Sequence, residues 1–300
     1  MQAFVRVVEA GSFTKAADTL HMSRASVTQL VQGLESRLRL KLLNRTTRRL
    51  NVTADGAVYY ERVVRLLAEL ADVEASLPNA HAAPRGKLRI DVPSPFATLL
   101  LVPALPAFHA RYPDIEFELG VSDRTVDLIG EGVDCVVRGG AVTDGALAAR
   151  RIGELGMGVY AAPSYIARAG LPHAPGALRD EGHRIVRFRG LRSSAASPYV
   201  LHKDGGSLEI SAPHVLAIDD GNAYLAAGLA GLGVLWLPDY MARTHVAAGA
   251  LVPLFTDWRI DPLPMYIAYP ANRHVGKKLR VFIDWMVELM AQQMAQQMAQ

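Results

Sequence analysis

Residues 11–34, GSFTKAADTLHMSRASVTQLVQGL, decide the fold of the first part of the chain. Gly11 ends a helix expected over residues 2–10, and Ser12 and Ser23 are each suited to cap a following helix. Small alanines on the second helix allow the third helix to cross it closely at a tight turn, which predicts a helix-turn-helix. The third helix is expected to bury the stripe Val27, Leu30, Val31, Leu34 and Leu38.

A wing and a long helix are expected next. Two short apolar segments flank the basic loop 44–49, which predicts two strands around a cationic tip. From Thr53 a helix is expected to run to about residue 77, with apolar residues spaced alternately four and three apart. This heptad seam is typical of pairing with a second helix, and packing against the chain's own domains is the alternative. The expected dimerisation residues are Tyr59, Val63, Leu66, Leu70, Val73 and Leu77.

The segment 78–86, PNAHAAPRG, breaks all periodicity and is expected to be a linker. Beyond it strands alternate with helices, which predicts an α/β body with mainly parallel sheets and helices on both faces. Strands are expected at 88–92, 115–119, 133–137, 157–161, 214–218, 234–237 and 265–269, and helices at 99–112, 126–131 and 222–230. The expected domains are a winged head at 1–56, a dimerising helix at 57–77, a flexible linker at 78–87, the body at 88–290 and a low-complexity tail at 291–300.

Composition limits the class of protein. Of 300 residues 50% are hydrophobic and 20% charged, which is typical of a globular protein of more than one domain. The lone Cys135 excludes an internal disulfide and a cysteine-based zinc cluster. The N-terminal residues MQAFVRVVEAGSF do not resemble a secretory signal, and no apolar run is long enough to cross a membrane, so a cytoplasmic protein is expected.

Charge is divided unevenly along the chain. Residues 1–65 hold 11 basic and 5 acidic residues, a balance of +6, while the remaining residues carry a balance of −3. A basic head favours a polyanionic partner. The alternative is a small domain that is merely basic.

Several fixed spacings resemble a known family. Residues 11–17, Leu20, 23–28, 34–35 and 44–48 resemble the winged helix-turn-helix of LysR-type transcriptional regulators, and residues 88–95, 101–113, 127–138 and 228–238 resemble that family's effector-binding domain. The family often has Pro where this chain has Ala25, so a base preference is not transferred. The family's first helix commonly begins a few residues earlier, which makes Met1 a candidate internal start.

The resemblance implies the architecture of the body and the partners of the protein. The body is expected to form two Rossmann-like lobes like a periplasmic solute-binding protein, at about 88–162 with 266–290 and at 163–265, with a small-molecule effector in the cleft between them. The protein is expected to be a sequence-specific transcriptional regulator that binds a dyad-related DNA operator as a homodimer or homotetramer. RNA polymerase is a further candidate partner.

The third helix is expected to read the major groove, which is wide enough for one helix. Arg24 suits a bidentate contact to guanine, Gln29 or Gln32 suits adenine, and the Thr28 methyl suits thymine. Ser23 and Thr28 are equally suited to bond phosphate, and a solvated polar face is the alternative for the whole set. The expected contacts on the helices are Ser12, Thr14, Ser23, Arg24, Ala25, Ser26, Thr28, Gln29 and Gln32.

In the wing, Arg48 and Arg49 are the favoured contacts to phosphate or to a narrow minor groove. Arg45 is expected to join them, or to form a salt bridge with Glu35 inside the head. Pairing of the wing arginines with acidic residues of the body is a further alternative.

Two segments predict the effector site. Ser94-Pro95-Phe96 follows the first strand of the body, and Asp219-Asp220-Gly221-Asn222 follows the strand that ends at Ile218. Ligands of open α/β sheets bind beyond the carboxyl ends of the strands, and a helix N-terminus favours an anion. The resemblance adds Ser122 after the second strand and Arg138 after the third; Arg138 is equally suited to a carboxylate effector or to a salt bridge with a nearby acid. The expected effector contacts are Ser94, Phe96, Ser122, Arg138, Asp219 and Asn222, and the effector is expected to be a carboxylate or an aromatic compound.

Catalytic signals are missing from the sequence. The glycine-rich stretch 228–233 precedes a predicted strand instead of following one, the histidines are not at metal-ligand spacings, and no nucleophile elbow is present. No catalytic residue, metal or cofactor is therefore expected. The alternative function is a cytosolic small-molecule binder or enzyme, which would keep its activity without residues 1–77.

Overall fold

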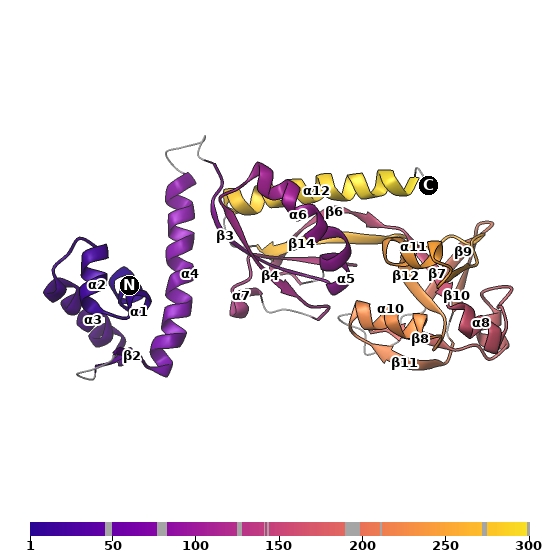
Figure 1. Ribbon diagram of the computed structural model, residues 1–300, viewed down its shortest axis with the longest axis horizontal. Helices are drawn as coiled ribbons and strands as arrows, with labels where there is room; N and C mark the ends of the chain where they lie inside the picture. The colour runs from indigo at the N-terminus through magenta and orange to yellow at the C-terminus, as the bar shows by residue number, and fades with distance from the viewer. Residues whose placement is uncertain are drawn as a thin grey trace. The chain divides into compact units, whose positions relative to one another are not determined.

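The computed structural model describes residues 1–45, 50–76, 83–124, 128–140, 142, 144–189, 199–210, 212–271 and 275–298. The chain divides into two compact units, Met1–Ala82 and Ala83–Gln300. Unit 1 consists of helices and one two-stranded sheet, and unit 2 is an α/β domain (Figure 1). The predicted fold class is confirmed.

Unit 1 begins with three short helices whose ends follow local chemistry. Gly11 ends the first helix in the left-handed conformation, with φ of 59°, and its N–H bonds to Val8 O. Ser12 and Ser23 cap the next two helices, and the Ser23 hydroxyl accepts from Ser26 N at 3.1 Å. The elements of unit 1 are α1 (Gln2–Ala10), α2 (Phe13–Thr19), α3 (Arg24–Leu38), β1 (Leu43–Arg45), β2 (Leu50–Val52) and α4 (Ala54–Ser76).

The core of unit 1 differs from the prediction at one position of α3. Val27, Val31 and Leu34 are buried, but Leu30 is 51% exposed. Leu30 lies a quarter turn from the centre of the buried stripe, at its edge, because successive residues advance by 100° around a helix. The expectation that Leu30 belongs to the core is therefore wrong.

The base of the wing is held by a buried carboxylate. Glu35 Oε1 accepts from Leu42 N at 2.9 Å and from Leu43 N at 3.2 Å. β1 then pairs with β2 in antiparallel register, Leu43 opposite Val52. Thr53, where this helix is predicted to begin, caps α4, because its hydroxyl accepts from Gly56 N at 2.9 Å.

The apolar face of α4 has two parts. In its first turns Tyr59 and Val63 pack into the core of unit 1; Val63 is only 2% exposed and the Tyr59 ring lies 5.7 Å from that of Phe4. Farther along, Leu66 and Leu70 are 55% and 49% exposed. The predicted seam is therefore not one continuous exposed surface, because the head covers its first half.

Unit 2 contains two lobes, of which lobe I (residues 86–155 and 263–298) is built on a five-stranded sheet of order β4-β3-β5-β14-β6. The strand β3 is parallel to β4 and β5, whereas β14 is antiparallel to both β5 and β6. The elements of lobe I are β3 (Gly86–Val92), α5 (Ser94–Phe96), the π-helix η1 (Ala97–Leu101), α6 (Val102–Arg111), β4 (Ile115–Val121), α7 (Leu128–Glu131), β5 (Cys135–Gly139), β6 (Leu147–Leu155), β14 (Leu263–Pro270) and α12 (Lys277–Met298).

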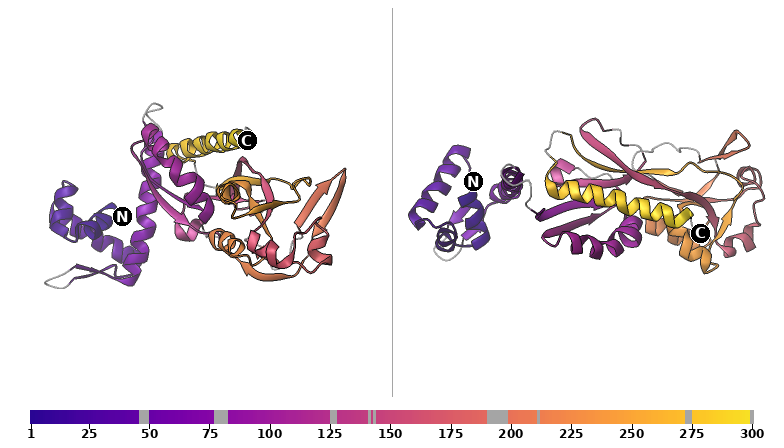
Figure 2. Two further views of the ribbon diagram at one scale, coloured as in Figure 1. Left: turned by 45° about the vertical axis from the view of Figure 1, so that its right-hand side comes forward. Right: turned by 90° about the horizontal axis from the view of Figure 1, so that it is seen from above.

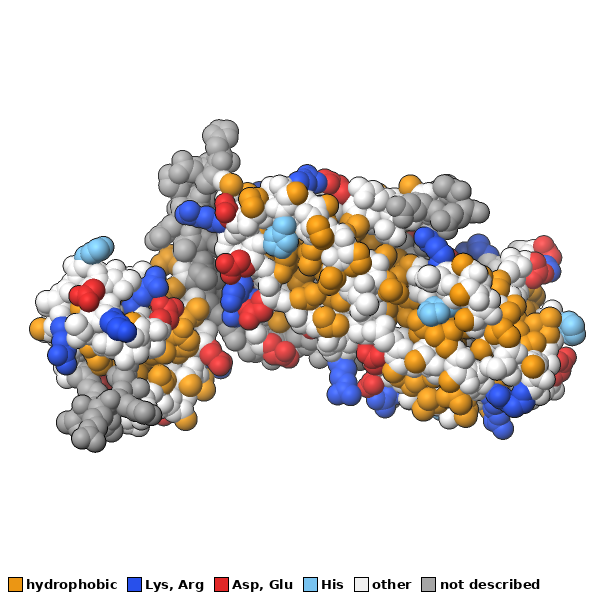
Figure 3. All heavy atoms as spheres, viewed as in Figure 1, with side chains coloured by type: hydrophobic (Ala, Val, Ile, Leu, Met, Phe, Trp, Pro, Cys, Tyr) orange, Lys and Arg blue, Asp and Glu red, His pale blue; other side chains and the backbone are white. Residues whose placement is uncertain are grey.

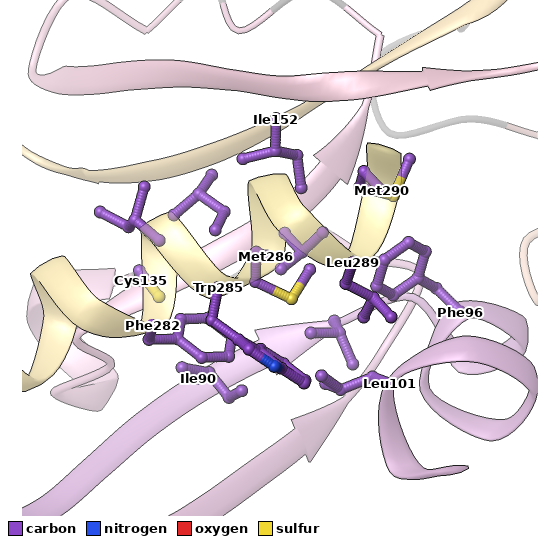
Figure 4. Packing of buried hydrophobic residues seen from close by; sticks show 14 of the residues in the cluster. Ile90, Phe96, Leu101, Cys135, Ile152, Phe282, Trp285, Met286, Leu289 and Met290 are labelled. Carbon is purple, nitrogen blue, oxygen red and sulfur yellow. The ribbon is translucent and has the colours of Figure 1, made fainter. Parts of the chain in front are cut away.

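The core of lobe I lies between this sheet and the helices α6 and α12. Phe282 and Trp285 of α12 lie beside Ile90 of β3, and Met286 and Leu289 extend the same face (Figure 4). Seen from above, α12 runs along the sheet (Figure 2). Alternate strand residues face this core, which is the two-residue period of a β-strand. The described part of the expected tail, residues 291–298, continues α12.

Lobe II (residues 157–254) is built on the antiparallel sheet β12-β7-β13 and the parallel pair β8–β11. Its helices cover both faces of the antiparallel sheet, since Tyr160 and Leu235 face one hydrophobic cluster and Val159 and Trp236 face another. The elements are β7 (Met157–Ala161), α8 (Pro163–Ala169), α9 (Ala177–Asp180), β8 (Ile185–Phe188), β9 (Tyr199–Lys203), β10 (Gly206–Ile210), β11 (His214–Ile218), α10 (Gly221–Leu229), β12 (Leu235–Pro238), α11 (Asp239–Ala247) and β13 (Val252–Leu254).

The structure corrects two expectations about unit 2. The sheets are not mainly parallel, because β14 returns the chain from lobe II into lobe I and pairs antiparallel with both of its neighbours. The boundary of lobe I lies near Gly156 and not at residue 162, since β7 pairs only with β12 and β13 among the described strands.

Candidate DNA-binding surface and effector site

The polar face of α3 lies opposite its buried stripe. Most of the residues expected to read bases are exposed on it, while two are half-buried near the core. The exposed residues are Arg24, Ala25, Gln29 and Gln32, and the half-buried residues are Ser26 and Thr28. The geometry therefore supports an outward role for the arginine and the glutamines more strongly than for Ser26 and Thr28.

The serine hydroxyls around the turn are used within the head. Ser12 Oγ accepts from Lys15 N at 3.5 Å, and Ser23 Oγ accepts from Ser26 N and lies 2.8 Å from Ser26 Oγ. A capping hydroxyl still has a proton to donate, so a phosphate contact remains compatible with this geometry. Thr14 is exposed on α2.

The tip of the predicted wing lies outside the described residues, and with it Arg48 and Arg49. Arg45 is the last residue of β1. The described partners of Glu35 are the two backbone amides at the start of the wing and Lys41 Nζ, at 3.5 Å.

Unit 1 retains unpaired positive charge. Arg6 pairs with Glu9 at 2.8 Å, whereas Arg24 has no ion-pair partner among the described residues of unit 1. Lys and Arg side chains are distributed over the viewed face of unit 1 in Figure 3. Arg24, on the exposed face at the start of α3, can therefore contact an external hydrogen-bond acceptor without first breaking an internal ion pair.

In unit 2, the residues that follow three strands meet at one place. Ser94 follows β3, Asp123 follows β4 and Asp220 follows β11. Ser94 Oγ lies 2.8 Å from Asp123 Oδ2 and 2.9 Å from Asp220 Oδ2, and Ser94 is 7% exposed. Asp123 also accepts from Ser94 N at 3.2 Å and from Gly221 N at 2.7 Å. The predicted effector segments 94–96 and 219–222 therefore lie together, and an aspartate occupies their amide donors.

Arg138 is bound within lobe I. Its side chain forms a buried ion pair with Asp91 on the neighbouring strand β3, and it also donates to Val137 O at 2.7 Å and Arg124 O at 3.1 Å. Burial raises the pKa of the Asp91 carboxyl, and the bond from Arg138 offsets part of that rise. Of the two roles expected for Arg138, the structure supports the internal salt bridge and not the carboxylate receptor.

A close approach at Gly120 accompanies this pair. A Cβ atom at Gly120 would lie 2.5 Å from Asp91 Oδ2, so the carboxylate uses the space that a side chain on β4 would fill. Through Arg124 O, Arg138 also fixes the loop that carries Asp123. Arg138 is therefore a positioning residue for the meeting point of the lobes.

The other expected effector contacts lie in different environments. Phe96 is 1% exposed in the core of lobe I, so the expectation that it contacts an effector is corrected. Ser122 Oγ accepts from Arg124 N at 3.0 Å. Asp219 pairs with Arg189 at 3.0 Å and with Arg124 at 3.5 Å, and the bond from Arg189 lowers the pKa of its carboxyl. Asn222 is exposed on α10.

Comparison with known proteins identifies both units. Residues 1–57 match the family model described as a bacterial regulatory helix-turn-helix protein of the lysR family, and residues 81–291 match the LysR substrate binding domain. The chain belongs to the LysR family of transcriptional regulators. Helix-turn-helix DNA binding and effector-responsive regulation are the functions of this family's two domains.

LysR-type relatives match over nearly the whole chain. An HTH-type transcriptional repressor of Pseudomonas aeruginosa is 36% identical over 96% of this chain and 90% of its own. The transcriptional regulator CrgA of Neisseria meningitidis is 36% identical over 96% of this chain and 95% of its own, and the activator AaeR of Escherichia coli is 32% identical over 96% and 94%. These relatives include both a repressor and an activator, so similarity alone does not assign activation or repression to this chain.

Solved structures of LysR-type regulators share the fold. The structure of CrgA has a TM-score of 0.59 and 34% identity, covering 96% of this chain and 97% of that one. Full-length AphB of Vibrio cholerae has a TM-score of 0.56 and 29% identity, covering 95% and 97%. The described residues of this LysR-type chain hold no group of three potential ligands suited to a metal ion. No helix among them is long and apolar enough to span a membrane.

Sequence reasoning missed two residues at the place where the predicted effector segments meet. Asp123 and Gly221 join the lobes, but only Ser122, Asp219 and Asn222 were selected around them. The signal was present, because Asp123 lies two residues beyond β4 just as Ser94 lies two residues beyond β3. The bond between Asp123 and Gly221 joins residues of different lobes, which spacing along the chain does not specify.

Proposed function

We propose that this LysR-type regulator reads a dyad-related operator through the exposed face of α3, with Arg24, Gln29 and Gln32 as the base contacts. The observation that carries this proposal is that these long polar side chains point outward from a helix whose opposite face is buried. A bidentate contact from arginine to guanine or from glutamine to adenine discriminates by about 1–3 kcal/mol. The wing arginines and the capping serines supply phosphate contacts, which position the head without reading sequence.

A titration of the full chain against its own upstream region and a random duplex, at two salt concentrations, tests this proposal. Arg24→Ala is expected to lose roughly 5- to 150-fold in affinity for the operator and much less for the random duplex. Arg6→Ala is the matched control, because it removes the same charge from an exposed residue of α1 that already pairs with Glu9. Equal losses on both duplexes for Arg24→Ala would contradict its role in reading bases.

We propose that two copies pair through the uncovered half of the α4 face. Leu66 and Leu70 lie one helical turn apart on the face that the head covers at Val63, and both are about half exposed. A second copy of the helix would remove these side chains from water and relate two heads by a dyad. The double variant Leu66→Glu, Leu70→Glu is expected to give monomers in analytical ultracentrifugation. Ala57→Glu, exposed on another face of α4, is the control.

We propose that a small-molecule effector binds where the segments 94–96 and 219–222 meet and changes the arrangement of the lobes. This position lies at the carboxyl ends of β3, β4 and β11, where ligands of α/β sheets bind. Regulation then requires that effector affinity differs between two arrangements. A thermal-shift screen of small carboxylic acids, aromatic acids and amines tests it. Hits that keep their full effect on Ser94→Ala would place the effector elsewhere.

A further inference from the structure

The two lobes of unit 2 are joined at the predicted effector site by contacts from one lobe to the other. Ser94 and Asp123 belong to lobe I, while Asp220 and Gly221 belong to lobe II. Asp123 Oδ2 accepts from Gly221 N at 2.7 Å, and Ser94 Oγ lies 2.9 Å from Asp220 Oδ2. Each contact crosses between lobes whose hydrophobic clusters are otherwise largely separate.

The Asp123 carboxylate accepts from three donors where the two lobes meet. Its carboxylate accepts from Ser94 N, from the Ser94 hydroxyl and from Gly221 N, the first N–H of α10. Amide donors at the start of a helix are the groups that bind anions in many proteins. Here an aspartate of the chain itself satisfies them, so no external group reaches these donors while Asp123 stays.

The charges at this place make the contact breakable. The Ser94 hydroxyl has one proton but lies within hydrogen-bond distance of two carboxylates, those of Asp123 and Asp220. Asp219 is occupied by Arg124 and Arg189, and no basic side chain pairs with Asp123 or Asp220 among the described residues. Two carboxylates that share one donor repel each other, so one of the two Ser94 bonds is weak at any moment.

We propose that Asp123 is an internal occupant of the effector site, a latch that holds the two lobes together and must leave its donors before an effector reaches them. This inference rests on the proposed effector site. The latch is defined by Ser94, Asp123, Asp220 and Gly221. Its release separates the lobe edges, so effector binding and lobe movement are the same event.

Gly221 provides an independent way to open the latch. A Cβ atom at Gly221 would lie 2.4 Å from Pro95 Cγ, across the contact between the lobes. Gly221→Ala therefore inserts a methyl group between the lobes and leaves both latch carboxylates and the hydrogen-bonding groups of all four latch residues in place. Gly176→Ala is the matched control, since its nearest neighbour would be 3.7 Å away and its φ of −60° suits alanine.

Spin-label distances between the lobes measure the latch directly. Cys135 is fully buried, so labels attach selectively to Glu116→Cys on β4 and Ser207→Cys on β10, both exposed. Labelled full-length protein is diluted with unlabelled protein, so that only distances within one chain are read. Asp123→Ala and Gly221→Ala are expected to give longer and broader distances than the unsubstituted chain, whereas Gly176→Ala is expected to match it.

Acetate tests whether the Asp123 carboxylate is the occupant. Removal of the side chain in Asp123→Ala leaves room for one acetate ion beside the Ser94 and Gly221 donors. Sodium acetate is expected to restore the short distance in Asp123→Ala but not in Gly221→Ala, and sodium chloride at equal ionic strength is expected to restore neither. Urea unfolding of each variant verifies that it is folded.

The outcomes separate the latch from the proposed function. The latch proposal would be overturned if the distances in Asp123→Ala or Gly221→Ala equalled those of the unsubstituted chain. It would also be overturned if the longer distance in Asp123→Ala did not change at saturating acetate. These measurements use neither DNA nor effector. A chain without operator preference would refute the proposed function and leave the distances unaffected.

Discussion

The buried pair of Asp91 and Arg138 gives a quantitative test of the arrangement in lobe I. The two side chains are only 8% and 9% exposed, and Arg138 also donates to backbone carbonyls of β5 and of the loop that carries Asp123. Arg138→Met removes the guanidinium group with its charge and keeps an unbranched, flexible stem. Asp91 is then a buried carboxylate without its counter-ion, and breaking such a pair costs about 3–5 kcal/mol.

The three tryptophans of the chain make this loss measurable in the full-length protein. Trp236, Trp258 and Trp285 all lie in unit 2, so their fluorescence reports its unfolding without a contribution from unit 1. With m of about 2–3 kcal/mol per M of urea, the loss lowers the unfolding midpoint by about 1–2.5 M. The loss is expected to grow as pH rises, because an unpaired buried carboxylate has a raised pKa and its ionised form is disfavoured in the folded state.

An exposed pair in the same lobe is the control. Arg150 and Asp284 lie 2.8 Å apart with side chains 49% and 53% exposed, so Arg150→Met is expected to cost at most about 1 kcal/mol. A midpoint for Arg138→Met equal to that for Arg150→Met would refute the reasoning, because it would mean that the burial of Asp91 carries no desolvation cost.

Three further expectations concern other parts of the chain. Glu35→Ala leaves the backbone amides of Leu42 and Leu43 without their acceptor and is expected to destabilise unit 1 by about 1–3 kcal/mol for each buried amide. Hydrogen exchange of both amides, measured by NMR, is expected to speed up in Glu35→Ala and to speed up less in Glu35→Gln. Gly56→Ala places a Cβ atom 2.1 Å from Leu42 O and is expected to destabilise unit 1 by about 1–3 kcal/mol. Gly33 has open space around it, so Gly33→Ala is the control and is expected to be neutral or stabilising. Thermal unfolding followed by circular dichroism compares the two variants. Burial raises the pKa of the Asp239 carboxyl above its ordinary value of 3.8, so the folded state holds that proton more tightly than the unfolded chain. Relative to Asp239→Asn, the unsubstituted protein is therefore expected to lose stability as pH rises from 3.8 through the raised pKa. Urea midpoints of the two proteins that change in parallel across that pH range would contradict this.

Local chemistry made the head predictable from sequence. Ser12, Ser23 and Thr53 each cap a helix by accepting from a backbone N–H three residues further on, so local sequence is enough to predict them. Short apolar runs likewise predicted β7 and β11, whose expected bounds 157–161 and 214–218 are those of the structure, although β11 is largely exposed. Leu30 shows the limit of periodicity, since a stripe of apolar residues does not reveal how wide the covering surface is.

Strands β6, β9 and β10 are not among those expected from the sequence. In β6 the exposed Arg150 and Arg151 interrupt the pattern, because part of this strand faces water. The hairpin of β9 and β10 had a usable signal in Asp204-Gly205, both with positive φ, which is the pair preferred in two-residue hairpin turns. In unit 2 the functional partners of Ser94 and Arg138 lie on other strands or in the other lobe, and only the folded chain brings them together.

The placement of β14 and α12 has a consequence for how the protein is made. Lobe II is an insertion within lobe I, since β6 leads out of lobe I and β14 leads back. On the ribosome, lobe II is therefore finished while the sheet of lobe I still lacks an inner strand and the helix that carries Phe282 and Trp285. The earlier half of lobe I must wait with an open apolar face until the last residues emerge. A nascent chain stopped before residue 263 is thus expected to present a native-like lobe II beside an unfinished lobe I, and chaperones would find their binding surface there.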